Sequence, residues 1–235
     1  MIPDVITVVK KELKEIMAIS FSRSHVLASL LMIGLLGFFI PWKSESYFLR
    51  QTSVTLSMYI LLTPLIVCSG FVADSFAGEK ERKTLESLLA TRIPDSAVFT
   101  GKIIAIFIYT YLFLLIVIFT SVGGANFYLY QAGKEEFFFY NSLSCFALFV
   151  FTIPVIIGGI AIGVFFSLQC KDTKTAFQLS RIGWFILSFP FITGWINLRI
   201  SWDFLMPGFY ILAAIDAALI AAGIRFFRRS RILAS

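Results

Sequence analysis

The charged residues that could do chemistry in this chain are concentrated in one stretch, GEKERKTLESLLATRIP, at residues 78–94. On a helix the leucines of this stretch share one face, while Glu79, Lys80 and Lys83 occupy the other. Glu79 and Lys83 are four residues apart with the acid first, which is the favourable order for a helical ion pair. Such a pair stabilises a helix by only about 0.2–0.5 kcal/mol, so helix stability alone does not explain these charges.

The segment that surrounds this stretch is locally neutral, with five acids and five bases from Asp74 to Lys102. We predict a helix over residues 77–92, with Asp74 or Ser75 available to cap its start and Pro94 to end it. A neutral amphipathic helix with a leucine stripe is suited to docking on a protein rather than on lipid headgroups. The alternative is a solvated helix whose leucines cover the underside of the bundle, and the pattern alone does not choose between the two.

Outside this segment, Asp216 is the residue most able to do chemistry, because it lies within the apolar run ILAAIDAALIAAG. Acids inside a membrane are costly and are often functional. The sequence predicts either that Asp216 accepts a hydrogen bond from a neighbouring helix, for instance from Thr or Tyr side chains of the third apolar segment, or that Asp216 lies in a transport pathway. An intramembrane aspartyl protease needs two such acids, and no second one lies in an apolar segment.

Other kinds of catalytic or ligand site are not predicted. His25 is the only histidine, and the three cysteines lack metal-ligand spacing, so we expect no metal site and no disulfide framework. The pattern Gly-x-x-x-x-Gly-Lys-Ser/Thr does not occur, so we expect no phosphate-binding loop for ATP. We therefore predict no catalytic residue and no cofactor bound by this chain.

The elements that must position these residues are membrane helices. The 235 residues are 58% hydrophobic and 14% charged, whereas soluble domains are about 45–50% apolar and 25% charged. The chain is therefore predicted to be an all-α integral membrane protein with a single domain, residues 1–235. A membrane helix needs ~20 apolar residues. Six segments fit this requirement: 26–42, 54–73, 103–122, 143–168, 182–198 and 205–227.

The basic residues predict the orientation of these spans. Sixteen of the twenty Lys and Arg residues fall on one side of a six-span arrangement. Because basic residues are enriched in cytoplasmic connections, both termini and the charged segment are predicted to be cytoplasmic in a multi-pass protein of the cell membrane. Positive charge spread over membrane-flanking loops also argues against nucleic-acid binding, despite the net charge of +6.

An amphipathic helix is predicted before the first span, over residues 4–20. Its apolar residues, among them Val5, Val9 and Leu13, fall within an arc of about 120°, and its lysines take the opposite side. This pattern is typical of a helix at the membrane interface, with its lysines facing anionic lipid headgroups. The alternative is an ordinary helix packed on the bundle.

The run GEKERKTLESLLATRIP, placed between a span and FTGKIIA, resembles the cytoplasmic loop of ABC-2 type transporter permeases. In that family, this loop joins the second and third spans as a coupling helix that inserts into a cleft of the ATP-binding subunit. By this resemblance, the contact surface comprises Glu79, Lys80, Glu81, Arg82, Thr84, Leu85, Glu86, Leu88 and Leu89. A second, weaker candidate contact is the loop with Lys171, Asp172 and Lys174, although the positive-inside rule alone also produces a basic loop there.

The resemblance implies that the chain is the permease subunit of an ATP-driven exporter, with ATP and Mg bound by a separate partner. It also implies that two permease subunits, identical or related, form the pathway between them. Two other functions stay open on the residues alone: a small intramembrane enzyme that uses Asp216, and a channel or scaffold outside the ABC class. Few charges lie in the apolar segments, which favours an apolar or amphipathic cargo.

Overall fold

The structure is a computed structural model, and all the secondary structure that it describes is helical. It describes the backbone of most of the chain, without the side chains of residues 187–198 and 224–226. The described residues are 2–43, 59, 62–82, 93–170, 172–198 and 201–226. The prediction of an all-α chain is confirmed for these residues.

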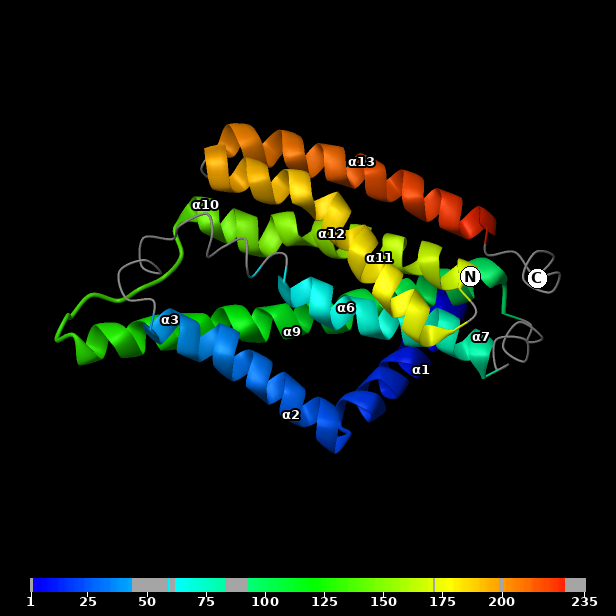
Figure 1. Cartoon of the computed structure of the whole chain (residues 1–235), viewed down its shortest axis with the longest axis horizontal. Coiled ribbons are helices and arrows are strands. Elements are labelled where there is room, and N and C mark those ends of the chain that lie inside the picture. Colours follow the sequence, from blue (N-terminus) through cyan, green and yellow to red (C-terminus); the bar gives the residue numbers. More distant parts are fainter. Residues whose placement is uncertain are drawn as a thin grey trace.

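The first two helical segments form a V at one edge of the molecule (Figure 1). Helix α1 (Ile2–Ser20) turns at Phe21 into α2 (Arg23–Met32), which continues without a break through η1 (Ile33–Phe39) and α3 (Ile40–Lys43). Helix α1 packs mainly on α9, and α3 and η1 pack on the same helix further along. The N-terminal helices therefore contact α9 at two places along its length.

The next described helix runs from α6 (Thr63–Ala73) through η3 (Asp74–Gly78) to α7 (Glu79–Glu81). Helix α9 (Asp95–Gln131) follows Pro94 and is 37 residues long. At 1.5 Å per residue it spans about 55 Å, well beyond a hydrocarbon core of about 30 Å. Its end is fixed by Gly133, whose φ of 67° suits glycine, and the backbone N–H of Lys134 donates to the carbonyl oxygen of Leu129.

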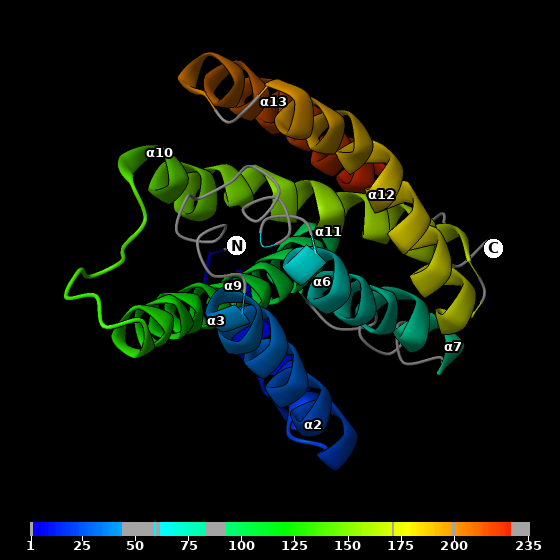
Figure 2. The same ribbon diagram turned by 60° about the vertical axis from the view of Figure 1, so that its left-hand side comes forward.

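The second half of the chain packs around one central helix. That helix runs from α10 (Ser142–Cys145) through η4 (Phe146–Phe151) to α11 (Thr152–Gln169), and it is followed by α12 (Thr173–Leu198) and α13 (Trp202–Phe226). Helix α11 contacts α6, α9, α12 and α13, and Figure 2 shows α12 and α13 lying together on its side. A Cβ atom at Gly159 would lie 2.1 Å from Nε1 of Trp184, so only glycine lets α12 approach α11 this closely.

Four described helices are long and apolar enough to cross a membrane: Arg23–Lys43, Asp95–Gln131, Ser142–Gln169 and Trp202–Gly223. Their positions overlap the predicted segments 26–42, 103–122, 143–168 and 205–227. Part of segment 54–73 lies outside the described residues, and segment 182–198 lies within α12. Two helices extend beyond the predicted spans, because α9 continues to Gln131 and α12 begins at Thr173, so the limits of the spans stay predictions.

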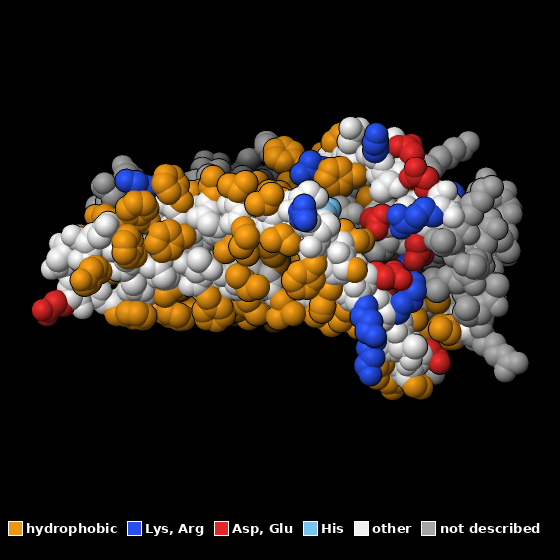
Figure 3. Space-filling view, turned by 90° about the horizontal axis from the view of Figure 1, so that it is seen from below, with side chains coloured by type: hydrophobic (Ala, Val, Ile, Leu, Met, Phe, Trp, Pro, Cys, Tyr) orange, Lys and Arg blue, Asp and Glu red, His pale blue; other side chains and the backbone are white. Residues whose placement is uncertain are grey.

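Polar and apolar side chains separate along the long axis of the molecule. Hydrophobic side chains cover most of the face in Figure 3, and Lys, Arg, Asp and Glu gather towards one end. Exposed large hydrophobic residues such as Leu31, Leu112 and Phe119 lie on helices away from that end. A surface of this kind is expected of helices in lipid. We call the end that contains α1 and residues 79–82 and 172–174 the charged end.

Candidate functional site: a buried charge cluster

The predicted contact segment falls partly within the described residues. Glu79, Lys80, Glu81 and Arg82 lie at the end of the helix that begins with α6. Five predicted contact residues lie outside the described residues, as does Lys171 of the second predicted contact. These five are Thr84, Leu85, Glu86, Leu88 and Leu89. The predicted leucine stripe therefore stays a prediction.

The predicted start of the coupling helix is wrong. No new helix begins near Ala77, because helical backbone runs continuously from Thr63 to Glu81. Asp74 has helical dihedral angles (φ −69°, ψ −42°) inside this helix and is not an N-cap. Residues 79–81 are therefore continuous with α6, without a loop between them.

Glu79 does not lie on the exposed face predicted for it. Its side chain is only 9% exposed, and one carboxylate oxygen accepts a hydrogen bond of 2.8 Å from Nζ of Lys102. Lys102 is fully buried in the second turn of α9, although it was counted among the basic residues of a loop. An ionised lysine is almost never buried without partners, so its surroundings define a site.

Lys102 binds three acceptors from two other helical segments. Its Nζ atom lies 2.9 Å from Oε1 of Glu12 on α1, 2.8 Å from Oε1 of Glu79 on α7 and 3.1 Å from the backbone oxygen of Ser75 on η3. A lysine ammonium has three N–H donors, and each has an acceptor here. The ammonium therefore joins α1, α9 and the end of the α6–α7 helix at one point.

Gly101, next to Lys102, allows α1 and α9 to pack closely enough for Glu12 to reach Lys102. A Cβ atom at Gly101 would lie only 2.7 Å from Cβ of Val8, so a larger residue would push α1 away from α9. Val8, Glu12 and Ile16 are the buried residues of α1, spaced by four on one face. This buried face differs from the predicted apolar arc, since Ile6 and Met17 are exposed.

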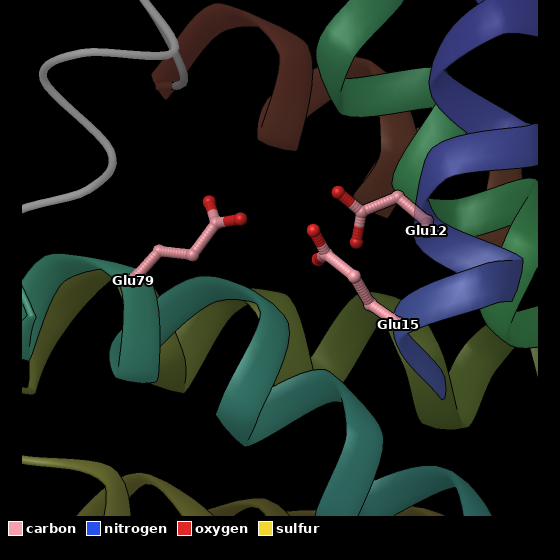
Figure 4. Close-up of side chains that lie close together, drawn as sticks. All are labelled: Glu12, Glu15 and Glu79. Atoms are coloured by element: carbon pink, nitrogen blue, oxygen red, sulfur yellow. The ribbon is translucent and has the colours of Figure 1, made fainter. Parts of the chain in front are cut away.

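Two further charges surround the cluster. Figure 4 shows the side chains of Glu12 and Glu15 on α1 and of Glu79 pointing towards one another. The three carboxylates approach closely enough to hold a metal ion, but Nζ of Lys102 already lies between Glu12 and Glu79. Lys11 adds a second ammonium, 3.2 Å from Glu15 and 3.8 Å from Glu79. Partial burial lowers the pKa of Lys11, but the nearby carboxylates outweigh burial and raise it above its usual value.

Arg82 takes a position at the rim of this cluster. Its guanidinium donates a hydrogen bond of 3.0 Å to Asp74, eight residues earlier. Both side chains lie over Gly78, where an added Cβ would come within 2.7 Å of the Asp74 carboxylate. The hydrogen bond from Arg82 raises its pKa further, so the arginine stays charged. This ion pair ties the residue that follows α7 back to Asp74 in the same helix.

The second predicted contact lies beside the first in space. The carboxylate of Glu81 accepts hydrogen bonds from the backbone N–H, at 3.1 Å, and the hydroxyl of Thr173 at the start of α12. Asp172 caps α12 by accepting bonds from the N–H and hydroxyl of Thr175, at 2.8 and 2.7 Å. These bonds hold the pKa of both carboxyl groups below the usual values. Lys174 is exposed next to this link.

Asp216 lies far along α13 and does not have the predicted partners. It is buried, with 3% exposure, and neither carboxylate oxygen has a hydrogen-bond partner among the described residues. The predicted hydrogen bond to Thr or Tyr side chains of α9 is therefore wrong for the part of the chain that the structure describes. The structure brings together residues 79–82 with Asp172, and leaves Asp216 apart.

Lys102 and Glu12 were not predicted as site residues, although the position of each in the sequence carried a signal. Lys102 lies within the apolar start of a span, in FTGKIIA. Glu12 is seven residues from Val5, so it falls about 20° from Val5 on a helical wheel, just beyond that edge of the predicted apolar arc. An acid at the edge of one apolar face and a base at the start of an apolar span each indicate a charge that needs a buried partner, although neither signal identifies that partner.

Comparison with known proteins relates the chain to a transporter family. No curated protein matches the chain significantly. The family described as ABC-2 family transporter protein matches residues 41–215, a region that includes Glu79, Lys102 and Asp216 but not Glu12. The match covers most of the chain, including the charged segment and its flanking helices. The chain therefore belongs to the ABC-2 family of membrane transporter proteins.

Proposed function

We propose that the chain is the permease subunit of an ATP-driven exporter and that the charge cluster of Lys102, Glu12 and Glu79 is its mechanical joint. The observation that carries this proposal is the fully buried Lys102 ammonium, which ties the motif residue Glu79 to α1 and α9. Membrane permeases of this family are transport components without an ATPase site of their own. A separate ABC ATP-binding subunit supplies ATP and Mg, and it pushes on residues 80–92.

Movement of residues 79–81 could reach the other helices through three connections. Residues 79–81 are continuous with α6, so a tilt of the segment moves that helix directly. Lys102 passes the same movement to α9 and α1, and Glu81 passes it to α12 through Thr173. Four helical segments would thus respond to one contact. We propose that this response alternates the access of a pathway formed between two permease subunits.

The membrane arrangement that we propose has six spans, with α6 and α12 added to the four apolar helices. The ends of α1, α7 and α13 lie at the same end of the molecule, which suits an even number of crossings (Figure 1). The excess of basic residues supports a cytoplasmic position for this end, with α1 at the membrane interface. The exposed residues Ile2, Ile6 and Met17 of α1 are available to contact lipid there.

The contact with the ATPase can be tested with the double variant Leu85→Ala, Leu88→Ala. Burying one leucine contributes ~1.5–3 kcal/mol, so losing two should weaken ATPase binding by a factor of roughly 100 or more. The matched control is Leu27→Ala, Leu31→Ala, which truncates two exposed leucines of α2. Affinity is measured between the purified permease and its ATPase. Unchanged affinity in a folded Leu85, Leu88 variant would remove the coupling assignment.

A further inference from the structure

A cavity of about 580 Å³ lies beside the charge cluster, between α1, α2, α6, α9 and α12. Ligand sites in proteins usually have volumes of ~300–1,000 Å³, so this cavity is large enough for a small organic ligand. It is also distinct from the cluster, because Lys102, Glu12 and Glu79 do not line it. Its two ends differ in chemistry.

One end of the cavity is apolar. Its wall there is formed by Met32 of α2, by Ile66, Val67 and Phe71 of α6, and by Phe113 of α9. Gly70 contributes no side chain to this wall, and a Cβ added there would meet only the ring of Phe177, at an ordinary contact distance of 3.7 Å. This part of the cavity is therefore open and suited to an alkyl chain.

The other end carries the charges. Arg82, Arg181 and Asp74 are the charged residues of the lining and His25 also lines the cavity, so two guanidinium groups and an imidazole accompany one carboxylate. Arg82 uses one of its five N–H donors on Asp74, and the guanidinium of Arg181 lies 4.4 Å from the centre of the Phe177 ring. Both arginines keep donors for an anion, and guanidinium groups bind phosphate and carboxylate in a bidentate manner.

The two ends are separated along the helices by about the length of a short alkyl chain. Met32 follows His25 by seven residues on α2, and Ile66 precedes Asp74 by eight on the α6–η3 helix. At 1.5 Å per residue these separations are about 10–12 Å. The polar end includes Arg82, which belongs to the charged end of the molecule. A ligand in a membrane leaflet would enter with its headgroup at this level.

We propose that this cavity binds an amphiphile with one alkyl chain and an anionic headgroup. The headgroup lies between Arg82 and Arg181, and the chain lies along Met32, Ile66 and Phe113. Because Arg82 belongs to the segment that follows α7, a bound anion competes with Asp74 for its guanidinium. The binding itself does not depend on coupling to an ATPase, so it is tested on the permease alone.

The probe is dodecyl phosphate, added to the purified full-length chain in a neutral maltoside detergent and followed by native mass spectrometry. We expect one saturable dodecyl phosphate per chain. Inorganic phosphate tests the headgroup without the chain, and dodecyltrimethylammonium tests the chain with the opposite charge. Binding of inorganic phosphate with equal affinity would reduce the cavity to a simple anion site. Equal binding of the cation would show that the arginines play no part, and either result would overturn the proposal.

Two variants and two controls locate the binding. Arg181→Gln removes one guanidinium and should weaken binding about tenfold, the effect of one charge-assisted hydrogen bond. Gly70→Leu fills the apolar part and should abolish binding. Lys174→Gln removes an exposed charge on α12 outside the cavity, and Gly123→Leu adds the same side chain where nothing lies within 4 Å of the added Cβ. Equal binding by both variants and both controls would place the ligand elsewhere and refute the site.

Discussion

Lys102 and Asp216 are both buried charged residues of membrane helices, yet their surroundings are opposite. Lys102 is fully buried and has an acceptor for each of its three donors, drawn from α1, η3 and α7. Asp216 is 3% exposed, and neither of its carboxylate oxygens has a partner among the described residues. The comparison shows that burial alone does not make a charge an anchor, because a satisfied charge fixes the positions of its partners, whereas an unsatisfied one lowers stability.

The largest expected effect is the loss of the Lys102 ammonium. Lys102→Met keeps the length of the side chain but leaves Glu12 and Glu79 buried without their shared counter-ion. Removing one partner of a buried ion pair costs about 3–5 kcal/mol, so the free energy of unfolding should fall by that amount. Thermal and denaturant unfolding of the purified permease measure this. Lys174→Met is the control, because an exposed lysine should change stability by at most about 0.5 kcal/mol.

A triple variant distinguishes the loss of ion pairs from the loss of packing around Lys102. If the damage in Lys102→Met comes from uncompensated carboxylates, then Glu12→Gln and Glu79→Gln in the same chain should recover much of the stability. A triple variant as unstable as Lys102→Met would instead assign the loss to packing in α9. It would contradict the role of the cluster as a set of charges that hold one another in place.

The next effect has the opposite sign and concerns Asp216. Asp216→Leu replaces an unsatisfied buried acid with an apolar side chain of similar size. Leaving such a group unsatisfied costs about 1–3 kcal/mol, so the variant should be more stable by about that amount. The same unfolding assay applies, with the exposed Asp203→Leu as the control. A marked loss of stability would show that Asp216 has a partner outside the described residues, and the contrast with Lys102 would weaken.

The smallest effect concerns the exposed link between Glu81 and α12. The pKa of Glu81 is lowered chiefly by the hydroxyl and N–H of Thr173, so its ionised form is the one bound. Its stabilising contribution is present above the usual Glu pKa of about 4.3 and is lost as the pH falls through the lowered value. Thr173→Val should therefore speed hydrogen exchange at the start of α12 at neutral pH and have no effect at low pH. Equal effects at both pH values would mean that the charge of Glu81 plays no part.

The all-helical fold was predictable from the sequence because lipid-facing helices need long apolar runs, which composition reveals directly. Helix ends were harder to predict, because polar residues do not always end a membrane helix. Asp74 and Ser75 suggested a cap, yet they lie inside a continuous helix where Asp74 pairs with Arg82. Likewise, α9 extends to Gln131 beyond the apolar span, through residues that belong to no predicted element.

The candidate site was predictable only in part. The motif located Glu79 and Arg82, because their charges stand out between apolar runs. The partners of Glu79 did not follow from the motif, since Glu12 lies 90 residues before Lys102 and in another helix. Long-range pairing of this kind depends on how α1 packs against α9 at Gly101, which no local pattern encodes. The sequence pattern therefore identified the charged residues of the motif better than the buried residues that bind them.

The most direct test of the joint is hydrogen exchange of α1 in the assembled transporter, with and without a non-hydrolysable ATP analogue bound to the partner. We expect nucleotide binding to change exchange at Val8–Ile16, although α1 is distant in sequence from the motif. The change should disappear in the variant Lys102→Met, Glu12→Gln, Glu79→Gln while the partner stays bound. Exchange in α1 that is the same with and without nucleotide in the unmodified protein would contradict the claim that Lys102 couples the motif to α1.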